Sequence, residues 1–464
     1  MTQLNGTNGK ERIKKVVMSW VANPQSGLLI EGATLQDINP LEIKVVNTTT
    51  TRTSEITKYI IEGIAEVQSN GGGEIKIPLE EMGIVLKHYL PGEIKDTANR
   101  RSERERISLE GAVLTCLGQH TKRVPRILAY TDQEIWMTNL GGDILSNRID
   151  KLDGESLRVL EFVVKNGMIG TFQDQLVETL GWNAIDIVRD LEGRGLLYRE
   201  SGKLLVTTRY GDIYTLDEEG QLQEKNELQE ERNLLVMKGV EALLEVQKVG
   251  NQAAEEIQRA GIVQQSLQDA IADDMKYIEG TLRYGKRILS ERENEKVIKT
   301  VKKLNECLYG FPEELRTNFI QGDGYSENLV TRFGDIFVLD FFHAGQGIWI
   351  SDIVDLVNYA HLFSGIEDTD KIYERALEQR SEFTQNPTVF KQYQKEIVYA
   401  MTMKRALRTL GTISWILSGE GNYIQAHHHE RNMLKHQRTA YASLLKKQLS
   451  ERRSLRRLAE LIET

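Results

Sequence analysis

The stretch from residue 319 to residue 352, FIQGDGYSENLVTRFGDIFVLDFFHAGQGIWISD, constrains this chain more than any other part of it. Asp323 lies in a glycine–aspartate–glycine turn, and Asn328 follows on the same loop. The apolar residues around the loop predict one strand leading in and one leading out, and the next apolar run predicts a hairpin strand that ends at Asp340. A lone aspartate in such a turn is usually turn chemistry. Here, three oxygen-bearing side chains are expected to converge at the strand ends.

These residue types suit phosphoryl transfer from a nucleotide. Asp323 can orient a hydroxyl group and accept its proton. Asn328 and Asp340 can hold Mg²⁺ against the phosphates, because this ion prefers oxygen ligands and often takes only one or two carboxylates from the protein. The stretch therefore predicts a metal-assisted phosphotransferase.

A second candidate site residue is Lys87, which interrupts the apolar segment GIVLKHY. A lysine inside such a strand costs desolvation unless it is paired. One interpretation is an edge strand with the lysine in solvent. The other is a lysine that holds nucleotide phosphates and pairs with Glu110, from the helix expected at residues 101–118.

Bulk composition is that of an ordinary globular protein. The chain has 464 residues, which is enough for two or three domains. Of these residues, 40% are hydrophobic and 27% are charged. Its net charge of −9 argues against non-specific binding of polyanions. Cys116 and Cys307 form no metal-binding or disulfide pattern. With no apolar leader and no membrane-length apolar run, the expectation is a soluble, cytoplasmic protein.

The pattern along the chain predicts an α+β protein in four parts. A helical extension is followed by a β-rich segment, then by three helices and a hairpin, and then by a long helical region that contains the loop of Asp323. The predicted boundaries are residues 1–40, 41–150, 151–217 and 218–464. In the second part the apolar runs LEIKVV, TKYIIEGIAEV, GEIKIP and GIVLKHYL predict separate strands, and NTTTTRTS predicts a loop.

The third part has the order of elements of a winged helix, with Ser201 and Gly202 in the turn of its hairpin. Winged helices often bind DNA through their third helix. Acidic residues outnumber basic ones by ten to seven between residues 152 and 216, and they include Asp186, Asp190 and Glu192 of the third helix. Because duplex binding needs several basic phosphate contacts, a protein partner or a substrate-gating role is favoured over DNA.

Two polar clusters lie near the C-terminus. His427, His428 and His429 are consecutive, so on a helix they point in different directions and predict a surface run rather than a metal site. Arg452, Arg453, Arg456 and Arg457 form a basic cluster. This cluster fits a solvated helix face, and the alternative is contact with an acidic partner or RNA.

The chain resembles the aminoglycoside phosphotransferase and choline kinase branch of the protein-kinase-like fold. The resemblance covers about residues 41–150 and 300–365. The residues that match the family's motif in type and spacing are Gly322-Asp323, Asn328, Asp340-Phe341, Gly347 and Asp352. It implies a bilobal fold that uses ATP and Mg²⁺, here with a winged-helix insertion. In that family Asp323 would be the catalytic base, Asn328 and Asp340 metal ligands, and Asp352 a brace for the loop. Lys87 would bind phosphates and pair with Glu110, and WMTNLGG would be the hinge strand beside the adenine.

Two departures from the family pattern stand out. Gln321 occupies the position of the family's histidine, which supports the loop. The loop NTTTTRTS lacks the glycines of protein kinases, although its hydroxyl and backbone N–H groups could cap phosphates.

Three hypotheses follow. The first is a kinase that phosphorylates a hydroxyl of a small molecule. The second is a protein or RNA kinase that recruits its substrate through the winged helix and the basic tail. The third is a nucleotide-binding pseudokinase that acts as a regulatory or DNA-binding protein.

Overall fold

The computed structural model describes most of the chain. The described residues are 7–22, 34–50, 54–68, 74–89, 103–152, 154–166, 171–182, 184–194, 196–201, 203–216, 222–225, 227–259, 261, 266–285, 290–316, 318–381, 387–418 and 428–450. The basic cluster predicted at residues 452–457 lies outside them, as do His427 and the side chains of His428 and His429.

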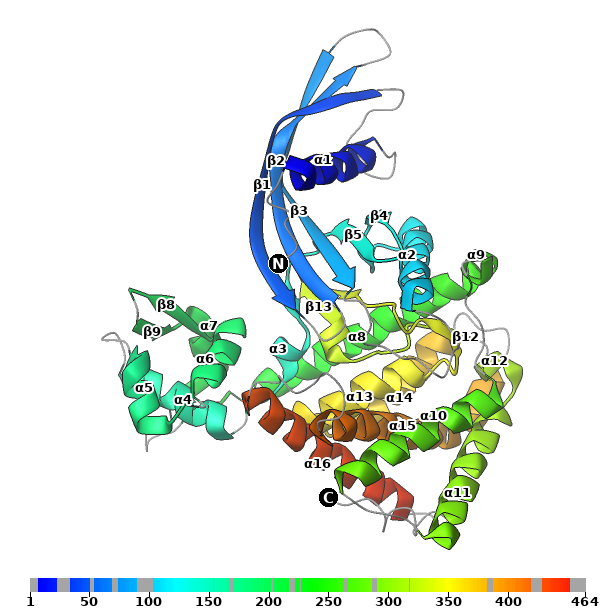
Figure 1. Ribbon diagram of the computed structural model, residues 1–464. Coiled ribbons are helices and arrows are strands. Elements are labelled where there is room, and N and C mark those ends of the chain that lie inside the picture. Colours follow the sequence, from blue (N-terminus) through cyan, green and yellow to red (C-terminus); the bar gives the residue numbers. More distant parts are fainter. Residues whose placement is uncertain are drawn as a thin grey trace.

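The N-terminal lobe is built on a five-stranded sheet of order β1-β2-β3-β5-β4, whose pairings are all antiparallel. The lobe stands above a larger helical lobe (Figure 1). Its elements are α1 (Thr7–Val21), β1 (Thr34–Thr50), β2 (Ser54–Gln68), β3 (Glu74–Tyr89), α2 (Glu103–His120), β4 (Ile127–Tyr130) and β5 (Glu134–Thr138).

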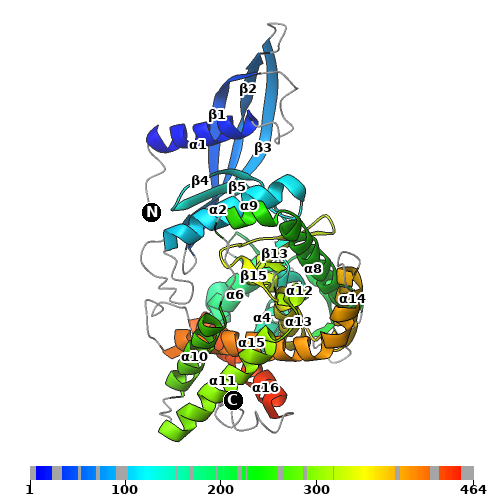
Figure 2. The same cartoon turned by 90° about the vertical axis from the view of Figure 1, so that its right-hand side faces the viewer.

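The first three strands are long, and α1 lies across one face of them (Figure 2). Alternate residues of β2, including Tyr59 and Ile61, are buried because successive side chains of a strand point to opposite faces. They share a core with the apolar face of α1, where Val17 and Trp20 are buried. The helix thus covers a sheet face that would otherwise meet water.

The strand predictions for this lobe were partly wrong. GEIKIP and GIVLKHYL form one strand, β3, because the polar residues between them make a bulge and not a turn. In register, Met82 pairs with Ile61 and Leu79 pairs with Gly63. β1 begins at Thr34, before the predicted boundary at residue 41, and its ladder runs to Thr50, into the predicted loop.

The helical lobe holds two apolar clusters, one of which is the largest among the described residues. α8 lies in the first, and α10, α15 and α16 pack around the second. Its helices are α8 (Glu227–Gln252), α9 (Ala254–Arg259), α10 (Leu267–Tyr284), α11 (Glu291–Tyr309), α12 (Glu313–Arg316), α13 (Ser351–Phe363), α14 (Thr369–Ser381), α15 (Pro387–Ser418) and α16 (His428–Ser450). These helices pack within the long helical region predicted at residues 218–464. No described helix combines the length and apolar character needed to cross a membrane.

Short strands bring the loop of Asp323 to the face of this lobe. They are β6 (Asp143–Ile144), β12 (Asn318–Ile320), β13 (Leu329–Arg332), β14 (Asp335–Val338) and β15 (Gly345–Gly347). β13 and β14 form the predicted hairpin, and β6, which precedes α3 (Ser146–Ile149), joins its edge. The predicted two-lobed arrangement, with a sheet-containing lobe and a larger helical lobe, is therefore confirmed.

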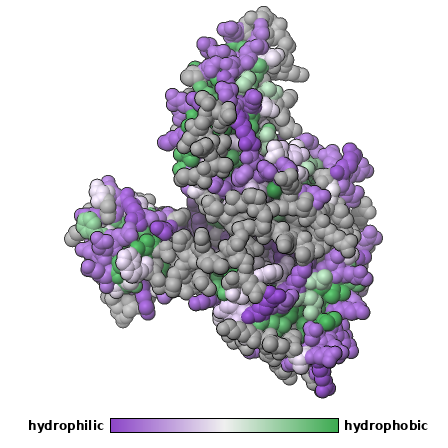
Figure 3. Space-filling model, viewed as in Figure 1, coloured by the Kyte–Doolittle hydropathy of each residue, from purple (hydrophilic) through white to green (hydrophobic). Residues whose placement is uncertain are grey.

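The segment inserted between α3 and α8 projects from the rest of the molecule (Figure 3). It has an apolar core of its own, centred on Leu160, Val188 and Leu191. Its elements are α4 (Gly154–Lys165), β7 (Thr171–Phe172), α5 (Gln173–Leu180), α6 (Ala184–Gly193), β8 (Leu197–Glu200), β9 (Lys203–Val206), α7 (Thr208–Ile213), β10 (Tyr214–Leu216) and β11 (Leu222–Glu224). Three helices before a hairpin match the predicted order, while the winged-helix assignment stays a prediction.

Candidate active site

Lys87 lies in the interior of the N-terminal sheet. Its strand β3 runs between β2 and β5, so the edge-strand interpretation is wrong. The residue is only 7% exposed. Its Nζ lies 3.1 and 3.2 Å from the two carboxylate oxygens of Glu110 and 3.0 Å from Oδ1 of Asp340. One ammonium group thus joins the strand and the helix of the N-terminal lobe to the loop that follows β14.

Glu110 is almost fully buried on α2 and has three donors. Besides Lys87, it accepts a hydrogen bond from the hydroxyl of Tyr89 and one of 3.2 Å from the backbone N–H of Phe341. Tyr89 also stacks on Phe342, with ring centroids 5.7 Å apart. Tyr89 was not among the predicted site residues, although its position two residues after Lys87 places both side chains on one face of β3.

Charge pairing outweighs burial for Lys87 and Asp340. Burial lowers the pKa of Lys87, but the carboxylates of Asp340 and Glu110 raise it by more. The pKa therefore lies well above its usual value. For Asp340, burial raises the pKa, and the adjacent ammonium of Lys87 more than reverses this, so the carboxyl titrates below its usual range. Lys87 and Asp340 therefore form a charged pair at neutral pH.

Asp340 has an unusual backbone conformation, with a φ of +55°. Left-handed conformations are uncommon outside glycine, although aspartate is among the residues that adopt them most readily. The hairpin of β13 and β14 delivers the residue, and Lys87 holds one of its carboxylate oxygens. Its side chain is still 40% exposed, which leaves it open to a further ligand.

Asp323 and Asn328 contact each other on the loop between β12 and β13. Nδ2 of Asn328 donates to the backbone carbonyl of Asp323 at 2.8 Å and to its Oδ2 at 3.1 Å. Because the amide nitrogen is used in this way, Oδ1 of Asn328 is the atom that could ligate a cation. An amide oxygen and an open carboxylate suit Mg²⁺, which completes its shell with water and phosphate oxygens.

Gln321 ties this loop to that of Asp340. Its Nε2 donates to the carbonyls of Leu339 and Asp340 at 3.0 and 2.5 Å, and its Oε1 accepts the backbone N–H of Asp323 at 2.7 Å. The side chain is 1% exposed. The residue that departs from the family pattern therefore makes supporting contacts of its own.

Asp352, at the start of α13, braces the same loop from below, as expected. Its carboxylate is fully buried and accepts the backbone N–H groups of Gln321 and Gly322 at 2.8 and 2.9 Å. The side chain of Gln247, on α8, donates a further bond of 3.2 Å. At Gly322, with a φ of +91°, an added Cβ would lie 2.1 Å from the carbonyl oxygen of His343. This position requires glycine.

The structure also brings two arginines to the loop that the sequence analysis missed. Arg405 and Arg408, on α15, both donate to the carbonyl of Gly322 at 3.0 Å. Nothing in their local sequence distinguished them, because helical spacing alone does not reveal which face of α15 meets the loop.

The predicted loop of residues 47–54 joins β1 and β2 at the sheet end that carries Lys87, because Ile56 pairs with Lys87 in register. Its described hydroxyl groups include Thr48, paired with Thr57 across the strands at 3.3 Å. At the expected hinge, the backbone N–H of Asn139 donates to the carbonyl of Gly83 at 2.9 Å. The side-chain oxygen of Asn139 accepts a hydrogen bond of 3.0 Å from the backbone N–H of Gly141.

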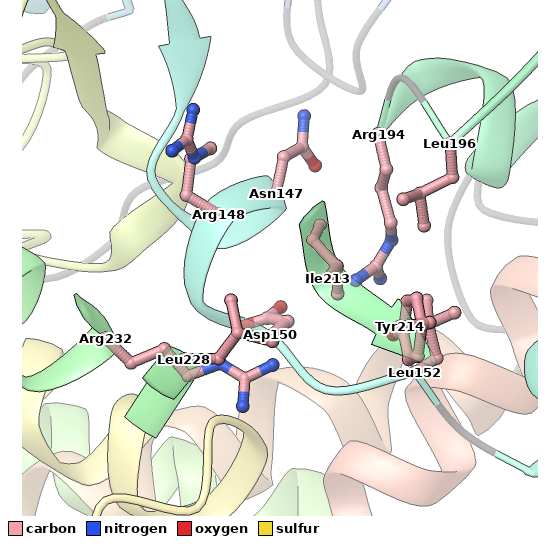
Figure 4. Close-up of a pocket in the computed structure, with 10 residues that line it drawn as sticks. All are labelled: Asn147, Arg148, Asp150, Leu152, Arg194, Leu196, Ile213, Tyr214, Leu228 and Arg232. Atoms are coloured by element: carbon pink, nitrogen blue, oxygen red, sulfur yellow. The ribbon is translucent and has the colours of Figure 1, made fainter. Parts of the chain in front are cut away.

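A separate cavity lies where the inserted segment meets α3 and α8 (Figure 4). It contains none of the predicted site residues. Its lining residues are Asn147, Arg148, Asp150, Leu152, Arg194, Leu196, Ile213, Tyr214, Leu228 and Arg232. Burial raises the pKa of Asp150 to about 6, although its carboxylate accepts the hydroxyl of Tyr359 at 2.6 Å.

No protein-family model matches the sequence, and no curated protein does. Among solved structures, an aminopropanol kinase associated with a microcompartment is 11% identical, with a TM-score of 0.42 over 94% of this chain and 98% of the other. A putative aminoglycoside phosphotransferase from Ralstonia eutropha is 12% identical, with a TM-score of 0.41 over 92% and 98%. An ethanolamine kinase from Plasmodium vivax is 10% identical, with a TM-score of 0.40 over 88% and 84%. Because these TM-scores are below 0.5, the function has to be inferred from the site itself.

Proposed function

We propose that this protein is an ATP- and Mg²⁺-dependent phosphotransferase that phosphorylates a hydroxyl group of a small molecule. The main support is the position of Lys87, whose ammonium group contacts Glu110 on one side and Asp340 on the other. Asp323 and Asn328 lie on the adjacent loop, which Gln321 joins to Asp340.

In the proposed reaction, Asp323 orients the acceptor hydroxyl and takes its proton. The hydroxyl oxygen forms a bond to the γ-phosphorus of ATP, the bond from that phosphorus to the β,γ-bridging oxygen breaks, and ADP leaves with the electron pair. Lys87 binds the phosphates, and Glu110 and Tyr89 hold Lys87 in position. Asn328 and Asp340 would hold Mg²⁺, which would neutralise charge on the phosphates.

The four predicted parts of the chain fit this proposal. The sheet lobe would hold the nucleotide, the helical lobe would hold the acceptor, and the inserted segment would act as a substrate gate or as a site for a protein partner. The acidic charge of that segment gives no support to the part of the second hypothesis in which an RNA substrate is recruited through it.

Nucleotide binding provides the first test. A ligand at about 100 times its dissociation constant stabilises the folded state by about 2.7 kcal/mol, so Mg-ATP should raise the melting temperature of the wild-type protein. Asp340→Asn keeps the shape of the side chain but removes its charge, and it should abolish that rise. Asp335→Ala, an exposed carboxylate on the same hairpin, is the matched control.

Transfer provides the second test. Protein incubated with γ-labelled ATP and a metabolite extract should place the label on a low-molecular-weight compound, and Asp323→Asn should prevent this. Label on a protein or RNA would favour the second hypothesis. Nucleotide binding without any transfer would favour the pseudokinase.

A further inference from the structure

Arg408 lies beside the predicted catalytic base. It projects from α15, in the C-terminal part of the helical lobe, toward the loop of Asp323. Its Nη1 donates to the carbonyl of Gly322 at 3.0 Å, and its Nη2 lies 3.6 Å from Oδ1 of Asp323. One planar guanidinium group thus contacts the backbone before the base and the side chain of the base itself.

Arg405, one turn earlier on α15, shows what a purely structural arginine looks like here. It also donates to the carbonyl of Gly322, but its Nε and Nη2 bind the buried carboxylate of Asp355. Asp355 lies on α13, so this pair joins two helices. Arg408 makes no such bidentate pair among the described contacts, and its side chain is 23% exposed.

Each carboxylate oxygen of Asp323 contacts a different side chain. Oδ2 accepts the amide of Asn328 at 3.1 Å, and Oδ1 faces Arg408. Two such contacts fix the plane of a carboxylate, whereas one leaves it free to rotate. Burial lowers the pKa of Arg408, but nearby groups that include Tyr277 and Asp323 raise it above its usual value, so the guanidinium stays charged.

We propose that Arg408 is a positioning residue that orients Asp323 and offsets its negative charge as the phosphoryl group approaches. This inference rests on the proposed function. It predicts that Arg408 stabilises the transition state for transfer more than the complex with nucleotide. Misplacing a catalytic group by about 1 Å can cost about 100-fold in rate.

The test compares binding of Mg-ADP alone with binding of Mg-ADP plus aluminium fluoride, which mimics the transferring phosphoryl group and needs no known acceptor. Transition-state mimics bind more tightly than ground-state ligands. Arg408→Gln should bind Mg-ADP as the wild type does and should lose about 10- to 100-fold of the tightening by fluoride. Arg408→Lys should lose less, because it keeps the charge without the planar fork. Lys395→Gln, on an exposed part of α15, is the control.

Chemical rescue with a guanidinium compound separates a positioning role of Arg408 from a role in folding. Added methylguanidinium should restore part of the tightening in Arg408→Ala and leave the Lys395→Gln protein unchanged. Undiminished tightening in Arg408→Gln would overturn the inference, and so would an equal loss of Mg-ADP binding in that variant. A wild-type protein that binds no Mg-ADP would refute the proposed function and this inference with it.

Discussion

Replacing Gln321 with alanine should loosen the loop that carries Asp323. The change removes three hydrogen bonds from a side chain that is 1% exposed, two to the carbonyls of Leu339 and Asp340 and one from the N–H of Asp323. Each such bond contributes about 1 kcal/mol net, and the groups left behind have little access to water. The expected cost is therefore about 3 kcal/mol of unfolding free energy.

Urea unfolding followed by circular dichroism measures this cost, because a lower midpoint with an unchanged slope reports lost stability. Gln321→His is the informative companion, since a neutral imidazole has one N–H donor and one acceptor. It can keep the bond from Asp323 and one carbonyl contact, so it should recover about two-thirds of the loss. Gln392→Ala, exposed on α15, should change stability by less than about 0.5 kcal/mol.

Catalysis should suffer as well, because the same side chain sets the distance between Asp323 and Asp340. If Gln321→Ala unfolded within about 1 kcal/mol of wild type, the bonding described for this residue would be wrong, since one lost bond would already cost that much.

Other predictions concern the buried charges. Lys87→Met leaves Glu110 and Asp340 without their shared cation, so urea unfolding should show a loss of about 3–5 kcal/mol and Mg-ATP should no longer raise the melting temperature; a protein as stable as wild type would contradict this. Tyr89→Phe keeps the ring but removes the bond to Glu110, and unfolding should show a loss of about 1.5–3 kcal/mol; unchanged stability in Tyr89→Phe together with a loss in Tyr89→Leu would instead point to the ring. The pKa of Asp150 is raised from 3.8 to about 6 in the folded protein, so the folded state binds this proton more tightly than the unfolded state does. The protonated carboxyl therefore stabilises the fold below pH 4, and this stabilisation is lost as the pH rises through 6. Compared with Asp150→Asn, wild type should lose about 3 kcal/mol over that range, and parallel pH–stability curves would refute the assignment.

Features encoded by local sequence were predictable. The spacing of Asp323, Asn328 and Asp340 follows from a turn and a hairpin, and both are present. A lysine in an apolar strand requires a partner, and Lys87 has the one expected in Glu110. In each case the cost of leaving a polar group unsatisfied restricts the arrangement.

Features that depend on long-range packing were not predictable. Arg408 lies 85 positions after Asp323, and its contact depends on how α15 crosses the loop. The supporting bonds of Gln321 depend on where the carbonyls of Leu339 and Asp340 point, which is a matter of backbone conformation. The bulge in β3 was mistaken for a break between two strands because both interrupt an apolar pattern with polar residues and glycine.

The inserted segment leaves and re-enters the helical lobe at neighbouring points. Asp150, just before it, and Leu228, just after it, line the same cavity, while its apolar core is separate from that of the lobe. A segment attached in this way can be gained, lost or exchanged during evolution without rethreading the chain around it. The site of Lys87 and Asp323 can therefore be inherited unchanged while the attached module diversifies.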